Sequence, residues 1–379
     1  MSAELIRKIE VLRHSKVVSY VTGDRAQIGL ARIAEDAVRR LYDHLLSIGK
    51  TRRIDLFLYS RGGDVSVPWR IVSMFRQFCR EFSVLVPYKA HSAATLISIG
   101  ADHIFMGKKA ELGPIDPTLV KNTLGDTSSP PREISVEDVN SYLDFLKEKA
   151  MISDQASLSD LVGILAKDLN PLTLGSVNRQ NSHIRTVARK LLSSRVRGPE
   201  EEKISAIIET LTEKMYSHGH AIGRREAAEI GLPVTEPTEE LEQLMWGLYL
   251  EYEEILRLNE TLDPFELVRE KDHVELNAVP IALMESNNLS HVFVNNVDIK
   301  LRRQVPQNAQ ISVNFAINLP PGIDPATLPE DLQKNMQHFV QQFGQVAQKA
   351  VQEELKKQSP EVGIDVRSYG GRWIKQAAK

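Results

Sequence analysis

The first part of the chain alternates short apolar runs with amphipathic stretches of helical spacing. Apolar residues of GLARIAEDAVRRLYDHLLSIG, 29–49, recur every three or four positions, which predicts a helix that ends at Gly49. The run IDLFLYS, 54–60, predicts a strand, and the following pattern predicts a helix over 68–82 with Pro68 in its first turn. SVLVP predicts a second strand, SAATLISIG a second helix and DHIFMG a third strand. This alternation over 54–107 predicts an α/β fold with a parallel sheet and helical crossovers.

The pattern changes twice further along the chain. After the turn-rich stretch GDTSSPPR, 125–132, the periodicity is helical, and from about 275 the runs VPIALMES, SHVFVNNVDIKLRR and QISVNFAIN predict strands. A glutamine-rich helix is predicted over about 329–357. We therefore expect three regions. Residues 1–125 form the N-terminal part of the core, 126–262 a helical segment that completes the core and forms an oligomerisation surface, and 263–379 a small α+β accessory domain.

Composition narrows the class of protein. The 379 residues are 42% hydrophobic and 26% charged with a net charge of −3, as in ordinary soluble globular proteins, and no basic surplus favours nucleic acid as a partner. The single cysteine, Cys79, excludes an intrachain disulfide and a cysteine-rich zinc site, and the pattern places it in the predicted helix 68–82. We find neither a signal-peptide core nor an uninterrupted apolar run that could span a membrane, so we expect a cytoplasmic protein.

Two neighbouring strand-to-helix junctions carry the candidate chemistry. Ser92 stands at the head of an apolar helix, where its hydroxyl could cap a free amide or act as a nucleophile. The turn RGGD, 61–64, closes the preceding strand, and its glycines allow close approach to the backbone. Because the carboxyl ends of parallel strands meet at one edge of a sheet, the amides of Gly63 and Ala93 could form an oxyanion hole beside Ser92.

These segments resemble a known group of peptidases. YSRGGDV resembles the SPGG turn of the Clp protease proteolytic subunit and of signal peptide peptidase, and AHSAATLISIGAD resembles their nucleophile helix. ELGPIDP, 111–117, NPLTLGSVNRQNSHIRTVARKLL, 170–192, and YSHGHAIGRREAAEIGLPVTEPT resemble the serine dehydrogenase proteinase family, a divergent branch of the Clp/crotonase fold. The resemblance covers about residues 50–260 and implies a core built as a β-β-α spiral. No dinucleotide-binding glycine fingerprint is present.

The resemblance also implies roles for particular residues. The family is described as using a Ser, Asp, His triad in that chain order, which assigns Ser92 as nucleophile, Asp116 as acid and His218 as base. His220 is an alternative base. A Ser–Lys dyad with Lys147 or Lys149 as base is a further alternative, although FLKEKA alternates charges as a solvated helix face does.

The leading hypothesis is thus a cytoplasmic serine peptidase that acts on a peptide or protein substrate without metal or cofactor. The resemblance implies a homo-oligomer. The charge balance and the lack of a long apolar run lead us to expect no nucleic-acid partner and no membrane span. Two other classes stay open. A crotonase-type enzyme would use the same paired amides to stabilise an enolate from an acyl thioester, and a non-catalytic oligomeric scaffold would retain the fold alone.

Overall fold

The computed structural model describes residues 2–25, 31–115, 118–121, 132–135, 139, 141–142, 144–168, 171–213, 219–304 and 328–376. The chain divides into two compact units. Unit 1 comprises Met1–Leu262, Ala278–Asn295 and Gly370–Lys379, and unit 2 comprises Asp263–Asn277 and Asn296–Tyr369. The boundaries expected near 125 and 262 stay predictions.

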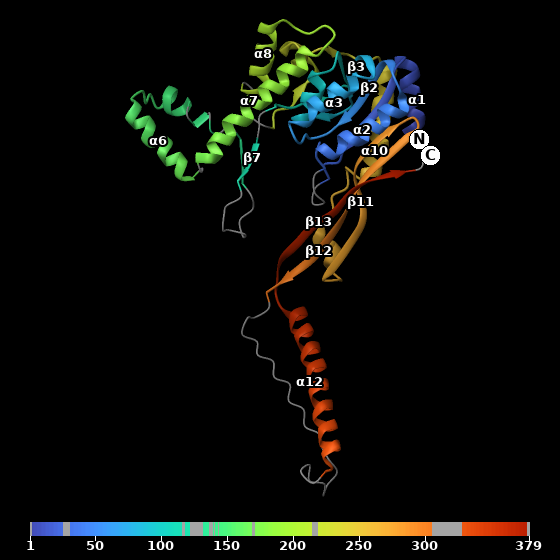
Figure 1. Ribbon diagram of the computed structural model, residues 1–379, viewed down its shortest axis with the longest axis vertical. Coiled ribbons are helices and arrows are strands. Elements are labelled where there is room, and N and C mark those ends of the chain that lie inside the picture. The colour runs from blue at the N-terminus through green and yellow to red at the C-terminus, as the bar shows by residue number, and fades with distance from the viewer. Residues whose placement is uncertain are drawn as a thin grey trace. The chain divides into compact units, whose positions relative to one another are not determined.

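A mostly parallel sheet lies at the centre of unit 1 (Figure 1). Its parallel strands are β1 (Lys16–Thr22), β2 (Thr51–Tyr59), β3 (Cys79–Val86), β5 (His103–Met106) and β10 (Val234–Thr235), in the order β10-β5-β3-β2-β1. Beyond β1 the order continues with β11 (His273–Ser286), β12 (Leu289–Arg303) and β13 (Glu361–Gln376), and β11 pairs antiparallel with β1. The mixed α/β fold with a parallel sheet and helical crossovers is therefore confirmed.

Two smaller sheets accompany this one. A three-stranded sheet contains β4 (Lys89–Ala90), β6 (Glu111–Leu112) and β9 (Ile222–Gly223), and a hairpin contains β7 (Thr118–Lys121) and β8 (Arg132–Ser135). Because β4 follows β3 after two residues and leads into the Ser92 helix, the three-stranded sheet adjoins the candidate site.

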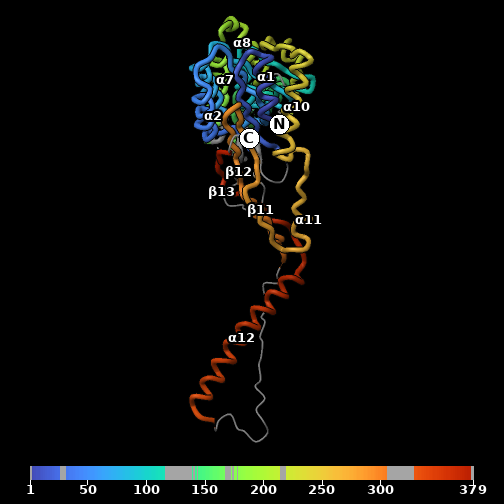
Figure 2. The backbone as a smooth tube through the Cα atoms, turned by 90° about the vertical axis from the view of Figure 1, so that its right-hand side faces the viewer, coloured from blue at the N-terminus to red at the C-terminus, as the bar shows by residue number. Residues whose placement is uncertain are grey.

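Helices cover both faces of the parallel part of the main sheet, so strands such as β2 are buried on two sides. One core cluster includes residues of α2 (Glu35–Ile48), α3 (Val67–Arg76), α4 (Ala93–Ile99), α7 (Pro171–Ser193) and α8 (Glu201–Thr212). The other includes residues of α1 (Ser2–Arg13) and α10 (Glu239–Leu256), which lie side by side (Figure 2). In β2, Leu56 and Leu58 join the first cluster, whereas Phe57 and Tyr59 join the second. This alternation explains why the strand reads as one continuous apolar run.

The remaining described elements are α6 (Gln155–Asp168), α9 (Arg224–Ile230), α11 (Pro264–Val268), α12 (Glu330–Gln358) and a short π-helix, η1 (Phe145–Lys149). α12 confirms the predicted glutamine-rich helix, and residues 287–288 form the turn between β11 and β12. The predicted strand QISVNFAIN lies outside the described residues. The sequence did not predict β13, in which charged residues and three glycines interrupt the apolar positions.

The predicted helix 68–82 is too long. α3 ends at Arg76, a turn follows, and Cys79 opens β3, so its assignment to a helix is wrong. The parallel register that pairs Thr51 with Cys79 extends both strands toward their amino ends, and this pairing outweighs the local helical period. Cys79 is half-buried, and burial raises the pKa of its thiol to about 12.

The predicted helix 29–49 begins later than expected but ends as expected. Ile33 forms a parallel bridge with Gly63, so α2 starts only at Glu35. Gly49 has φ 73°, and its amide donates to the carbonyl of Leu45 over 2.9 Å, which confirms it as the C-cap. The bridge at Ile33 brings the segment before α2 to the RGGD turn.

Candidate active site

Strand register places the two junctions side by side. Ser60, at the end of β2, forms a parallel bridge with Ala90, at the end of β4. The Ser60 amide donates to the Lys89 carbonyl, and the His91 amide donates to the Ser60 carbonyl, both over 2.9 Å. The residues two positions after this bridge, Gly62 and Ser92, therefore lie next to each other. A Cβ atom on Gly62 would lie 2.8 Å from Cβ of Ser92, and with φ 108° this position accepts only glycine without strain.

Ser92 has an unusual backbone conformation. Its φ of 50° and ψ of −112° lie in a region that side-chain-bearing residues rarely adopt, and it directly precedes the buried helix α4. Its hydroxyl makes no cap hydrogen bond, so the capping hypothesis is wrong. A strained residue on a sharp strand-to-helix turn is a recurrent way to present a nucleophile. The nucleophile hypothesis stays a prediction.

The predicted oxyanion donors are both uncommitted. Neither the Gly63 amide nor the Ala93 amide donates a hydrogen bond to any described residue. The neighbours of Gly63 are held in place, because the Ile33 amide donates to the Gly62 carbonyl and the Asp64 amide donates to the Ile33 carbonyl. A Cβ on Gly63 would lie 2.2 Å from the Ile33 carbonyl oxygen. The turn is thus fixed by backbone contacts while its amide remains available to a ligand.

A charged cluster behind the site was not predicted from the sequence. Asp24, just past β1, accepts hydrogen bonds from the Tyr59 hydroxyl at 2.8 Å, Arg61 Nε at 2.5 Å and Lys89 Nζ at 3.2 Å. Burial raises the pKa of Asp24, but Arg61, Tyr59 and Lys89 outweigh it and hold that pKa below its usual range. Each partner follows or closes a strand of the sheet, which is the sequence signal that could have indicated the cluster.

The helix that carries Ser92 is oriented by side-chain hydrogen bonds. Thr95 Oγ1 donates to the Ala90 carbonyl at 2.7 Å and accepts from the Gly113 amide at 3.1 Å. His91 lies next to Ser92 in sequence, but its Nε2 is 3.1 Å from Glu111 Oε1. Burial lowers the pKa of His91, Glu111 opposes the shift and Arg61 adds to it. These bonds connect α4 and β4 to β6.

The other predicted site residues are not brought to Ser92 in the described part of the chain. Asp116 and His218 lie outside the described residues, and their roles in a triad stay predictions. His220 is described, and its Nε2 lies 2.8 Å from Glu226 Oε1 in a partly exposed pair. Lys147 and Lys149 are exposed on η1, whereas a lysine that acts as a base needs a buried setting.

The described residues show neither a cluster of metal ligands nor a membrane-spanning helix. The described part of the chain holds no group of three or more His, Cys, Asp or Glu side chains that could bind a metal ion. Among the helices that the structure describes, none combines the length and apolar composition needed to cross a membrane.

The N-terminal third of the chain is similar to a known family of proteins. Residues 2–128 match the family model described as ClpP-like SDH-type serine proteinase, which confirms the resemblance over the segment that contains Gly63 and Ser92. An uncharacterized protein of Methanocaldococcus jannaschii is 28% identical over 250 residues, covering 64% of this chain and 76% of its own length. A second uncharacterized protein of that organism is 28% identical over 119 residues, 30% of this chain and 41% of its own length.

Two solved structures are similar to part of the chain at low sequence identity. A ClpP1 mutant from Listeria monocytogenes is 13% identical with a TM-score of 0.32, over 62% of this chain and 99% of its own. A mutant of the 1510-N membrane-bound stomatin-specific protease is 16% identical with a TM-score of 0.35, over 61% and 85%. Likenesses of this size say nothing about the substrate or the mechanism of this chain.

Proposed function

We propose that this protein is a serine peptidase with Ser92 as its nucleophile. The observation that carries the proposal is the backbone of Ser92, held at φ 50° against Gly62 with two uncommitted amides in the adjoining turns. A strained, half-buried serine without a capping role needs another explanation, and presentation of its hydroxyl to a substrate supplies one. The match of residues 2–128 to ClpP-like serine proteinases supports the same class of reaction.

The proposed reaction follows acyl transfer. Ser92 Oγ attacks the peptide carbonyl carbon while its proton passes to His218, and Asp116 orients the imidazole. The amides of Gly63 and Ala93 donate to the oxyanion. His218 then gives the proton to the leaving amine, which departs as the acyl-enzyme forms. A water molecule attacks the ester, its proton passes to His218 and then to Ser92 Oγ, and the acid is released.

The broader setting is part of the same proposal. The substrate is a peptide or protein, the compartment is the cytoplasm, and the active form is a homo-oligomer. No step above requires a metal ion or a nucleotide. The exposed positions of Lys147 and Lys149 weigh against the Ser–Lys alternative, because a lysine that serves as the base of such a dyad lies in a buried, apolar setting.

A fluorophosphonate probe tests the nucleophile directly. We expect one adduct at Ser92, mapped by mass spectrometry, that disappears in Ser92→Ala. Ser73→Ala is the matched control, because Ser73 is a partly buried helical serine whose hydroxyl donates to the Arg70 carbonyl of its own helix. Cleavage of a denatured protein substrate should be lost in Ser92→Ala and retained in Ser73→Ala.

The base is tested with the same probe. We expect His218→Ala to reduce labelling greatly and His220→Ala to leave most of it. Labelling that is insensitive to both substitutions would transfer the role of base to Lys147 or Lys149. Absence of labelling together with tight binding to an acyl-CoA resin would contradict the peptidase proposal and favour acyl-thioester chemistry.

A further inference from the structure

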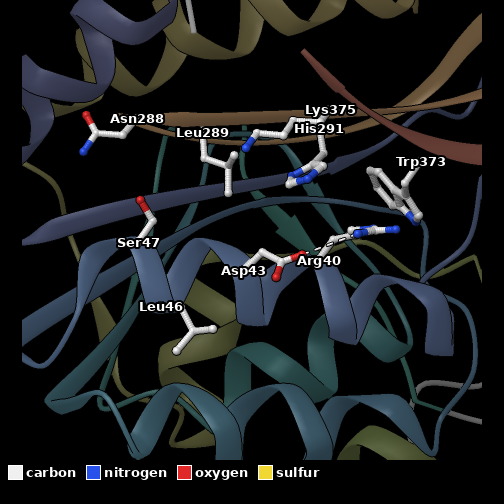
Figure 3. A pocket seen from close by; sticks show the side chains of 9 residues that line it. All are labelled: Arg40, Asp43, Leu46, Ser47, Asn288, Leu289, His291, Trp373 and Lys375. Carbon is white, nitrogen blue, oxygen red and sulfur yellow. Dashed lines mark hydrogen bonds and ion pairs between the residues drawn. The ribbon is translucent and has the colours of Figure 1, made fainter. Parts of the chain in front are cut away.

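A pocket of about 530 Å³ lies near the amino end of β1, remote from the Ser92 edge. It is formed by the second half of α2, the β11–β12 turn and the end of β13 (Figure 3). Val18, near the amino end of β1, pairs with Ser286, and the pocket residues of the β11–β12 turn follow Ser286 directly. Asp24 and the Ser92 site lie toward the opposite, carboxyl end of β1. Its lining residues are Arg40, Asp43, Leu46, Ser47, Asn288, Leu289, His291, Trp373 and Lys375. All of them belong to unit 1.

A chain of buried hydrogen bonds ends at this pocket. Ser286 Oγ lies 2.8 Å from His44 Nδ1, and His44 Nε2 lies 3.1 Å from His291 Nδ1. His44 is fully buried, and Ser286 and His291 are each 4% exposed. His291 is the member of this chain that lines the pocket (Figure 3).

The direction of the protons follows from counting donors and acceptors. Burial lowers the pKa of His44 to about 3 and also lowers that of His291, so each ring is neutral and carries one N–H. Suppose that His291 donated to His44 and His44 donated to Ser286. The serine hydroxyl would then need a further acceptor for its own proton, and no described residue provides one. Ser286 therefore donates to His44, and His44 donates to His291 Nδ1. This leaves the Nε2–H of His291 as a donor in the pocket.

The charges around this donor favour an anion. Arg40 and Lys375 both line the pocket, and Lys375 forms no ion pair with a described residue. The one carboxylate of the lining, Asp43, already accepts from Arg40 at 3.4 Å and from Arg39. The end of β13 is fixed against α2, because Trp373 Nε1 donates to Asp36 Oδ2 at 2.7 Å. This bond holds β13, which carries Lys375, beside α2, which carries Arg40.

We propose that this pocket binds a small molecule through an oxyanion, a phosphate or carboxylate group, that accepts from His291 Nε2–H and pairs with Lys375 and Arg40. The volume suits a small organic ligand. A neutral donor beside two cations favours an anion, since hydrogen bonds to a charged group are stronger than those between neutral groups. Ser47 and Asn288 add neutral groups for the rest of the ligand.

The test uses the full chain, with inorganic phosphate and acetate as probes at constant ionic strength. We expect a saturable rise of the unfolding temperature with at least one probe, and a matching change of the ¹⁵N signals of His291 in histidine-labelled protein. A response to phosphate assigns a phosphate ligand, and a response to acetate alone assigns a carboxylate. Before any addition, both rings should show the neutral form with the proton on Nε2 at pH 7.

Variants make the test specific. Lys375→Met should weaken binding about tenfold, the effect of one charge-assisted hydrogen bond. Lys349→Met on α12 removes the same charge from an exposed position outside the pocket and should leave binding unchanged. Equal binding by the two variants would show an adventitious ion only and would overturn the proposal, as would no response to either probe. Ser92→Ala should bind normally, so the outcome is independent of the peptidase proposal.

Discussion

Helices α4 and α12 obtain their stability in opposite ways. All seven residues of α4 are buried, whereas none of the 29 residues of α12 is buried. A helix of seven residues cannot persist alone in water, so α4 exists because the surrounding layers enclose it. In α12, acidic residues in the first turn and basic residues in the last turn complement the helix dipole. Its length of 29 residues adds backbone hydrogen bonds that stabilise the helix further.

This difference bears directly on the candidate site. Ser92 precedes the helix that depends most on its surroundings, so small changes in neighbouring backbone should alter both stability and reactivity. The exposed surface of α12, which includes Phe339 at 62% and Val346 at 65% exposure, should tolerate substitution with little effect on the fold. The following substitutions examine this contrast.

The largest effect is expected at Gly63. Gly63→Ala would place a Cβ 2.2 Å from the Ile33 carbonyl oxygen at a φ of 157°, so the backbone must shift. We expect a loss of about 3 to 5 kcal/mol in the free energy of unfolding, measured by urea denaturation. Gly163→Ala is the control, because a Cβ there meets nothing within 4 Å and Ala favours the helix. Similar stabilities for the two variants would remove the claim that this turn is tightly constrained.

A smaller loss is expected at Asp24. Asp24→Asn keeps the shape but removes the charge that binds Arg61 and Lys89, and we expect a loss of about 1 to 3 kcal/mol at pH 7. The native pKa of Asp24 is below its ordinary 3.8, so the stabilisation is full above that pH and disappears as pH falls through the native pKa. Urea denaturation of both proteins between pH 7 and pH 2 measures this. A difference that persists unchanged at pH 2 would contradict the account.

Ser92→Gly should stabilise the protein. Glycine accepts φ 50° without the strain that serine stores there, and the hydroxyl makes no cap bond that could be lost. We expect a gain of about 1 kcal/mol in the free energy of unfolding and complete loss of fluorophosphonate labelling. Ser92→Ala, which retains the strain, should match the wild type in stability. A glycine variant less stable than the alanine variant would argue against strain at this residue.

The smallest effect is expected on α12. Phe339→Gln replaces an exposed ring by a residue that is common along this helix, and we expect a change within about 0.5 kcal/mol. Thermal unfolding followed by circular dichroism measures it. A large loss of stability would show that the ring contributes to a packed contact, and the contrast between α12 and α4 would then fail.

Much of the fold could be predicted from hydrophobic spacing. The strand ending at Tyr59, the helix end at Gly49 and the glutamine-rich helix follow local periods and glycine positions that a short window contains. The wrong element boundaries occur where a segment pairs with a strand or turn far away in the sequence. Cys79 belongs to β3 because β2 lies beside it, and the start of α2 moves to Glu35 because Ile33 bridges to Gly63.

Only part of the candidate site could be predicted from the sequence. The spacing of RGGD and Ser92 after successive strands placed both at one sheet edge, and the bridge between Ser60 and Ala90 brings the two turns together. The conformation of Ser92 and its missing cap bond could not be anticipated, because the sequence pattern of a capping serine is the same.

The sequence by itself determined the elements whose hydrophobic period and turn residues lie within a few positions, such as α12 and the end of α2 at Gly49. The tertiary structure decided which side chains meet across long separations. His44 and His291 are 247 residues apart, and Asp24 contacts Lys89 across 65. Such contacts depend on strand register and layer packing, which arise only when the whole sheet is assembled and each buried polar group must find its partner.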